Sequence, residues 1–343
     1  MATMNEAIGA AIKQIEAARK PEDTVPWKPD TPHPQPLYVF SPTTQTWTPS
    51  PSVSASSAAP AVAKLALFTW NIDFMLPHGP SRMSAALAEL HARIAALDPA
   101  TAALVFLQEC VAADLDLLGA TDWVRAGFAR TDVGNAAWAS EMYGTTTLVD
   151  RRLGVRGVFR AHFGSTRMER DGLFVDVVFP GGRVGDGEGE KVVRLCNTHL
   201  ESLAQEPPFR PPQVAVAARF MKEEGVHGAL LAGDLNAIQP FDRTLHAANG
   251  LRDAYLALGG AEDSDEGYTW GQQAPPELRR LYGCSRMDKV WYCGRVAVTK
   301  FARFGADVEV ADAGEREDIM RWGGFEKGWV TDHLGVWAEV VVE

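Results

Sequence analysis

Short apolar runs recur along the chain from residue 61 onward, and several of them end on polar side chains. Runs of about four to eight residues that are bounded by turn-forming residues are typical of buried β-strands. The pattern predicts strands over residues 65–71, 103–108, 145–149, 173–179, 192–198, 229–234, 287–292 and 335–342.

Two segments instead show apolar side chains at helical spacing. The first helix should end at Asp98, because the residue before a proline is disfavoured in the helical conformation. A second helix is expected over about residues 213–224. Many strands with few long helices indicate sheets packed face to face, with helices on the outside. The apolar face of the first helix would consist of Leu87, Leu90, Ile94 and Leu97.

The first 60 residues differ from the rest of the chain in composition. Ile8, Ile12 and Ile15 recur at helical spacing, and a stretch dense in Pro, Ser and Thr follows them. Such a composition is typical of a short amphipathic helix followed by a flexible arm. We therefore expect an arm over residues 1–60 and one globular domain over residues 61–343.

Charge and composition narrow the classes of function. The net charge of −11 argues against a protein that coats nucleic acid, because such binding needs a basic surface, but it leaves room for an enzyme with a local basic groove. The four cysteines show no CxxC spacing, which favours reduced thiols. The sequence shows no signal-peptide pattern and no apolar run of membrane-spanning length. We expect a location in the nucleus or cytoplasm, without secretion or a membrane partner.

Six strand-like segments carry polar residues at or near one end. Any one of them alone is more often a turn residue, a solvated strand end or a satisfied core histidine. Six together indicate a shared site, because the ends of core strands in layered α/β folds face a common crevice. These residues are Asn71 and Asp73; Gln108 and Glu109; Asn197, His199, Glu201 and Ser202; Asp234 and Asn236; Asp288; and Asp332 and His333.

These residue types suit the attack of water on a phosphoester with the help of a hard divalent cation. Mg²⁺ prefers oxygen ligands, and Glu109 is the first candidate. Asp234 and Asn236, two positions apart on an extended segment, could activate and position the water. A cationic imidazole could stabilise the phosphate charge, either His333 held by Asp288 or His199 from the other side.

The ordered set WNID, LQE, THLES, GDLN, MDK and TDH resembles the endonuclease/exonuclease/phosphatase superfamily over about residues 68–340. Within it the chain looks most like the 5′-tyrosyl-DNA phosphodiesterases. The segments similar to that branch are TWNID, THLES, FGSTRM at 163–168, YTW at 268–270, TDHLG, and the pair Arg210 and Gln213.

The resemblance implies a DNase-like four-layer α/β sandwich, in which two packed mixed β-sheets are flanked by helices, with Mg²⁺ or Mn²⁺ as cofactor. It implies Glu109 as the metal ligand and Asp332 beside the metal network. Asp234 would be the general base. The remaining implied roles are Asn71 in the phosphate and water network, Asn236 positioning the water, His333 stabilising the transition state, Asp288 orienting it, and His199 contacting the scissile phosphate.

The implied substrate is a single-stranded DNA 5′ end that carries a tyrosyl adduct, as in the removal of trapped topoisomerase during DNA repair. A single strand can be bound by aromatic stacking and scattered basic contacts. The expected substrate contacts are Trp270, Tyr143, Arg167, Arg210 and Ser202.

One departure from that branch leaves other functions open. The branch has an arginine two residues after the Asp/Asn motif, where this chain has Ile238. The alternatives are another phosphoesterase of the superfamily, acting on abasic DNA, RNA or a phosphorylated small molecule, and a catalytically silent interaction protein. The silent protein would require an eroded site, whereas the expected acids, amides and histidines are all present.

Overall fold

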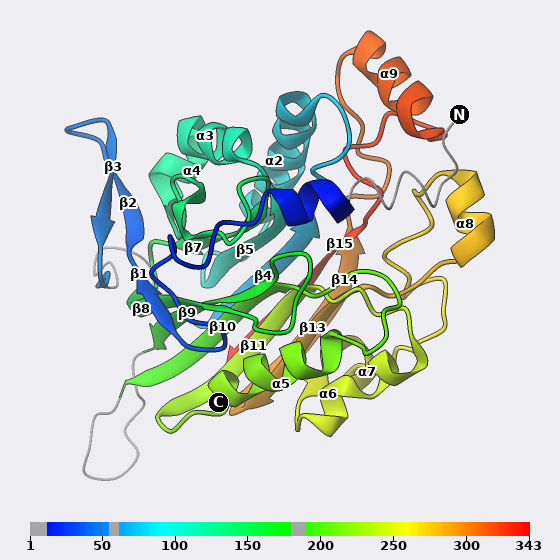
Figure 1. The fold of residues 1–343 in the computed structure, drawn as a ribbon. Coiled ribbons are helices and arrows are strands. Elements are labelled where there is room, and N and C mark those ends of the chain that lie inside the picture. Colours follow the sequence, from blue (N-terminus) through cyan, green and yellow to red (C-terminus); the bar gives the residue numbers. More distant parts are fainter. Residues whose placement is uncertain (1–11, 55–61, 180–189) are drawn as a thin grey trace.

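The computed structural model describes residues 12–54, 62–179 and 190–343. Two β-sheets pack face to face, and helices cover the outer face of each sheet (Figure 1). This arrangement is the four-layer α/β sandwich predicted from the sequence. Ile8 of the predicted N-terminal helix lies outside the described residues, whereas residues 12–17 are helical.

The first sheet contains seven of the described strands, in the order β1-β8-β9-β10-β11-β13-β12. It is mixed, because β10 and β11 run parallel while their other neighbours are antiparallel. Its strands are β1 (His33–Gln35), β8 (Gly154–His162), β9 (Asp171–Phe179), β10 (Lys191–His199), β11 (Val226–Asp234), β12 (Arg252–Asp253) and β13 (Asp288–Gly294).

The second sheet contains eight of the described strands, in the order β14-β15-β4-β5-β7-β6-β2-β3, with β4 and β5 parallel. All eight strands predicted from the sequence occur in the two sheets, with ends shifted by a few residues. The strands of this sheet are β2 (Leu37–Ser41), β3 (Thr46–Ser50), β4 (Lys64–Asn71), β5 (Thr101–Cys110), β6 (Phe128–Arg130), β7 (Gly144–Asp150), β14 (Val296–Phe304) and β15 (Gly335–Val342).

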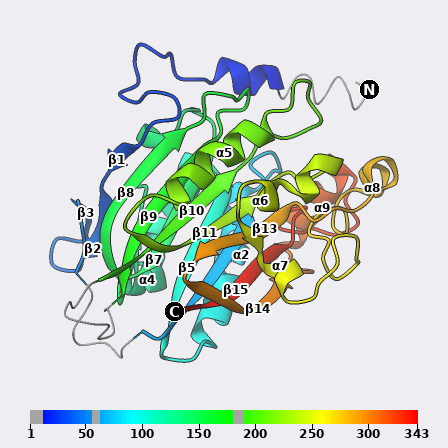
Figure 2. The ribbon, with the colours of Figure 1, turned by 90° about the horizontal axis from the view of Figure 1, so that it is seen from below.

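Helices close the two outer faces of the sandwich, as the views in Figures 1 and 2 show. α2 (Gly79–Ala95) and α3 (Ala112–Ala120) pack on the eight-stranded sheet, and α5 (Arg210–Met221) packs on the seven-stranded sheet. α2 ends before Asp98-Pro99, as predicted. No helix in the described part of the chain combines the length and the hydropathy needed to cross a membrane. The others are α4 (Asp122–Gly127), η1 (Asn135–Ala137), η2 (Pro240–Arg243), α6 (Leu245–Ala248), α7 (Ala254–Ala257), α8 (Pro276–Tyr282) and α9 (Ala313–Gly323).

Alternation along β4 shows how the strands divide their side chains between two cores. Leu65 and Leu67 lie in the core between the sheets, whereas Phe68 and Trp70 pack against α2 and α3. Because successive side chains of a strand point to opposite faces, Asn71 continues the row that faces the other sheet. The same alternation applies to β10, β11 and β13, whose inward-facing side chains lie in this inner core along most of the strand and at the polar end of the sandwich at one end of it.

The predicted flexible arm is wrong for residues 33–50. β1 pairs with β8 at one edge of the seven-stranded sheet, and the β2-β3 hairpin pairs with β6 at an edge of the eight-stranded sheet. Leu37 is fully buried in the core between the sheets. Residues 33–50 therefore belong to the sandwich, because their backbone extends both sheets and their side chains contribute to its core.

Candidate active site

The candidate site lies at the end of the sandwich where β4, β5, β10 and β11 finish and β13 and β15 begin. A buried polar bridge separates it from the apolar core, since the Gln108 carboxamide donates to Asn197 of the other sheet at 2.8 Å. Beyond this bridge every strand of the group presents a polar side chain. The sequence-predicted strand ends therefore meet in one place.

Asn71 holds two carboxylates together. Its side-chain nitrogen donates to Glu109 Oε1 at 3.2 Å and to Asp234 Oδ2 at 3.0 Å. Its side-chain oxygen accepts the backbone N–H of Asp73 at 2.9 Å. With 1% exposure, Asn71 has no freedom to turn, so it fixes the separation between these two acids.

Glu109 reaches the site through an irregularity in β5. Simple alternation would place it on the α2 side of the sheet, but its φ of 58° and the register shift between Leu107 and Cys110 redirect the chain. A positive φ at a residue other than glycine is uncommon and marks a position that the surroundings hold in place. Glu109 Oε2 accepts the backbone N–H of Phe74 at 3.1 Å, which fixes the carboxylate toward the loop after β4.

Asp234 lies at the centre of the site, at the end of β11. Its Oδ1 accepts the backbone N–H of Asn236 at 2.9 Å, and its Oδ2 lies 3.3 Å from His199 Nε2. The preceding Gly233 has a φ of 149°, and a Cβ there would lie 1.7 Å from the carbonyl oxygen of Thr198. Only glycine lets β11 approach β10 this closely. Burial alone would raise the pKa of Asp234, but the imidazoles of His333 and His199 lower it below its ordinary value.

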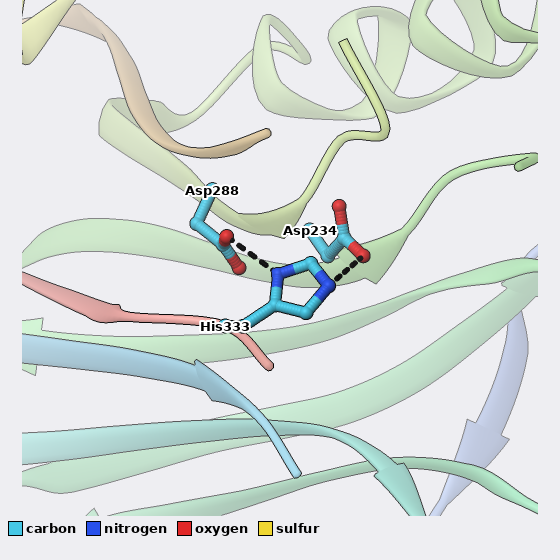
Figure 3. Close-up of side chains that lie close together, drawn as sticks. All are labelled: Asp234, Asp288 and His333. Atoms are coloured by element: carbon cyan, nitrogen blue, oxygen red, sulfur yellow. Dashed lines mark hydrogen bonds and ion pairs between the residues drawn. The ribbon is translucent and has the colours of Figure 1, made fainter. Parts of the chain in front are cut away.

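His333 lies between two acids, as Figure 3 shows. Its Nδ1 is 2.8 Å from Asp288 Oδ2, and its Nε2 is 3.7 Å from Asp234 Oδ2. The second distance is too long for a hydrogen bond, so Nε2–H stays available to a ligand. Burial would lower the pKa of His333, but Asp288, Asp234 and Asp332 raise it well above its ordinary value. The imidazole is therefore cationic at neutral pH.

His199 is held as a neutral imidazole by Arg170. The guanidinium of Arg170 lies 2.5 Å from His199 Nδ1, and because arginine can only donate, Nδ1 must accept. The ring proton is then on Nε2, facing Asp234. Burial and the charge of Arg170 lower the pKa of His199, in agreement with the neutral form.

Three carboxylates next to this centre, those of Asp73, Glu109 and Asp332, have the composition of a site for a hard cation. Burial, Asp332 and Glu109 raise the pKa of Asp73 to about 7, and burial raises the pKa of Asp332, with Glu109 adding to it. A divalent cation would relieve this repulsion between carboxylates, and oxygen-only ligands suit Mg²⁺ or Mn²⁺. The residues present therefore fit a metal held by Glu109 and Asp332, with Asp73 beside them.

A second group, Asp234, Asp288 and His333, has ligand atoms that all lie within 4.8 Å of one another, the only such group of three among the described residues. A metal ligand must be a neutral imidazole, whereas the neighbouring acids favour the protonated form of His333. The hydrogen bond to Asp288 also occupies Nδ1. We therefore assign this group to proton and charge chemistry, and the cation to the Glu109 side.

The five predicted substrate contacts lie in different environments. Trp270 donates its indole N–H to Asp332 Oδ2 at 2.7 Å, and so holds a candidate metal ligand. Ser202 accepts a hydrogen bond from Arg170 at 3.0 Å, beside His199. Arg210 is not positioned as a substrate contact, because it is 2% exposed and donates to both oxygens of Asp242. It holds the loop that follows Asn236.

Tyr143 and Arg167 are covered in part by the N-terminal helix. Tyr143 is 4% exposed and forms a cluster with Ile15 and Met168, so it packs as a wall of the site. Arg167 is exposed, and its guanidinium lies 2.7 Å from the carboxylate of Glu16. The helix at residues 12–17 thus lies against both residues.

Sequence reasoning missed one residue that shapes the site and gave another no role. Arg170 is buried, contacts His199, and lies over the ring of Tyr143 at 5.3 Å. Glu201 was noted only as a polar strand end, yet it is 1% exposed and accepts from Thr166 Oγ1 at 2.7 Å. The one signal for Arg170 was its position directly before an apolar strand, where a charged residue must find a partner.

Comparisons with known proteins identify the family. A model of the Endonuclease/Exonuclease/phosphatase family matches residues 68–333, which is more than half of the chain. No curated protein matches the sequence.

Three solved structures illustrate the likeness of fold. A truncated Caenorhabditis elegans TDP2 is 21% identical, with a TM-score of 0.59 over 81% of this chain and 98% of that chain. D. rerio TDP2 complexed with a single-strand DNA product is 19% identical, with a TM-score of 0.58 over the same shares. The human Nocturnin catalytic domain with a bound sulfate is 14% identical, with a TM-score of 0.53 over 82% of this chain and 95% of that chain. The chain therefore belongs to the endonuclease/exonuclease/phosphatase family and is a metal-dependent phosphoester hydrolase.

Proposed function

We propose that this enzyme hydrolyses the phosphodiester that joins a tyrosine to the 5′ end of single-stranded DNA, as in the repair of trapped topoisomerase. The observation that carries the proposal is the pairing of Asp234 with the His333-Asp288 couple in one buried site beside the Glu109 carboxylate. The likeness in fold to a TDP2 complexed with a single-strand DNA product supports this choice of substrate.

The residues divide the reaction as follows. Asp234, whose pKa is lowered, stays ionised and accepts the proton of the attacking water, while Asn71 and the backbone of Asn236 hold its two oxygens in place. His333 donates its Nε2–H to a phosphate oxygen as negative charge develops there. Asp288 keeps the ring oriented through Nδ1.

His199 faces the same space from β10. Its Nε2–H, fixed by Arg170, points toward Asp234, and we assign it to a contact with the scissile phosphate. Glu109 and Asp332 would hold Mg²⁺ or Mn²⁺. When bound, the cation supplies positive charge that stabilises the phosphoryl transition state. Nucleus or cytoplasm is the proposed location, in keeping with four free cysteines.

The test is tyrosine release from a 5′-phosphotyrosyl single-stranded oligonucleotide in the presence of Mg²⁺. EDTA should abolish the release, and Asp234→Asn should lower turnover by roughly 10²–10⁴-fold. Asp176→Asn, a partly buried acid that pairs with Arg194 away from the site, is the matched control and should keep its activity.

Other substrates are kept in view by one observation. Ile238 is 42% exposed where the tyrosyl-DNA branch has an arginine, so one cationic contact for DNA is absent at that position. Abasic DNA, RNA and inositol phosphate should therefore be assayed beside the tyrosyl substrate. Activity on one of these without tyrosine release would overturn the proposed substrate and leave the catalytic residues as assigned.

A further inference from the structure

Arg82 lies in the first turns of α2, is 2% exposed, and has every N–H donor bound to a backbone carbonyl. An arginine side chain has five such donors in a rigid planar fork. The five acceptors, at 2.6–2.8 Å, are the carbonyl oxygens of Ile72, Asp73, Leu76, Pro77 and Val330.

These carbonyls belong to two segments that are distant in sequence. The first, residues 72–77, follows Asn71 and includes Phe74, whose backbone N–H holds Glu109. The second contains Val330, two residues before Asp332. The guanidinium therefore joins the two segments that position the candidate metal ligands, Glu109 on one side and Asp332 on the other.

The charge of Arg82 has no direct partner. Across residues 12–54, 62–179 and 190–343 the structure places no carboxylate oxygen within 4.0 Å of its guanidinium. Burying an unpaired charge is costly, and packing of α2 alone would not require it. The neighbours that act on it through space include Asp73, Glu109 and Asp332, the same carboxylates that surround the candidate cation site.

We propose that Arg82 is a positioning residue for the metal centre, which sets the spacing between Glu109 and Asp332 by joining the carbonyls of both segments. The inference rests on the metal ligands assigned under the proposed function, but not on the substrate. On this proposal, the backbone of the two segments determines the metal affinity together with the ligands.

A role of the Arg82 charge and a role of its geometry predict different effects, which makes the proposal testable. Removing a cation beside a cation site would strengthen metal binding, whereas loosening the two segments would weaken it. Arg82→Lys keeps the charge but cannot reach five carbonyls. We expect Arg82→Lys to bind Mn²⁺ about tenfold more weakly by calorimetry, the lower end of the effect usual for residues that support metal ligands.

Arg130→Lys is the matched control. Arg130 is also buried and also donates to a backbone carbonyl, that of Leu115 at 2.6 Å, but it contacts none of the site residues. Its Mn²⁺ affinity should equal that of the wild type. Unchanged Mn²⁺ affinity in a folded Arg82→Lys variant would overturn the proposal, and so would equal losses in the two variants.

Thr331 provides a second variant if Arg82→Lys fails to fold. Its hydroxyl donates to the carbonyl of Asn71 at 2.9 Å and accepts from the backbone N–H of His333 at 3.2 Å, so it joins Asn71, which directly precedes the first segment, to the second. Thr331→Val is close to isosteric and should weaken Mn²⁺ binding in the same direction. Wild-type Mn²⁺ affinity in this variant would contradict the proposal. Because the measurement uses the metal alone, it does not depend on which phosphoester is the substrate.

Discussion

Asp234 and Asp288 lie directly opposite each other in the antiparallel pairing of β11 with β13, and both are buried. Two carboxylates on adjacent strands repel each other, and the low polarity of the interior strengthens that repulsion. The imidazole of His333 lies between them and offsets it. The pairing thus supplies both the negative charge that keeps His333 protonated and the carboxylate, that of Asp234, that can accept a proton from water.

Asp288→Asn should shift the pH dependence of the reaction. Asp288 raises the pKa of His333, so its removal lowers that pKa. Activity needs the imidazolium and is lost as pH rises through its pKa, so the basic limb of the kcat profile should move to lower pH. A pH profile of kcat for wild type and variant measures this. A lower kcat with an unmoved basic limb would exclude the proposed coupling.

Glu109→Gln should weaken the binding of the metal. Mg²⁺ binds the folded state and should raise the Tm of the wild type in a concentration-dependent way. Loss of the Glu109 charge should abolish most of this shift and lower the rate. Glu141→Gln, an exposed acid, is the control and should show the full shift. An unchanged Mg²⁺ response in Glu109→Gln would remove Glu109 from the ligand set.

His162 should make the protein sensitive to acid. It is 4% exposed and stacks on Trp27 at 4.0 Å, and burial together with Arg160 lowers its pKa to about 2. The unfolded chain takes up a proton below about pH 6.5, whereas the folded chain resists it. Stability is therefore intact above that pH and falls as pH drops from 6.5 toward 2, by up to about 1.4 kcal/mol per pH unit.

Denaturant unfolding of His162→Gln from pH 7 to pH 4 measures this slope. The variant should lose less stability over this range than the wild type. His91→Gln, at an exposed helix position, should follow the wild-type curve. Parallel curves for His162→Gln and wild type would show that another group governs the acid sensitivity.

Leu37→Ala tests whether residues 33–50 belong to the fold. Leu37 is fully buried between the sheets, so its truncation should lower the free energy of unfolding by about 2–5 kcal/mol. A flexible arm would show no change. Thr43→Ala, in the exposed turn between β2 and β3, should stay close to wild type in the same measurement.

The inward-facing part of the site could be predicted from the sequence, because it follows from strand alternation alone. Asn71, Asp234 and Asp288 each extend a row of side chains that begins in the core between the sheets. Glu109 was predicted as a site residue, but the way in which it reaches the site was not. The positive φ that turns it toward the site cannot be inferred from the pattern of apolar residues. Arg170 depends on partners distant in sequence, His199 and Ser202, and local pattern cannot reveal such pairs.

The N-terminal strands were missed for a different reason. Pro34 lies in β1 and Pro49 in β3, and proline usually argues against a strand. Both strands, however, are the outermost of their sheets, where a missing N–H donor leaves no partner unsatisfied. Pro34 and Pro49 therefore lie in edge strands of the sandwich, although the proline-rich composition of this segment predicted a flexible arm.

The pairing of β1 with β8 also affects how the chain is assembled during translation. Gln35 and Arg160 contact each other although they are 125 positions apart. At about 5–20 residues per second, residues 33–50 leave the ribosome several seconds before the strands that they will join. Residues 33–50 therefore wait for β6 and β8 before they can pair, and one edge of each sheet stays open until then.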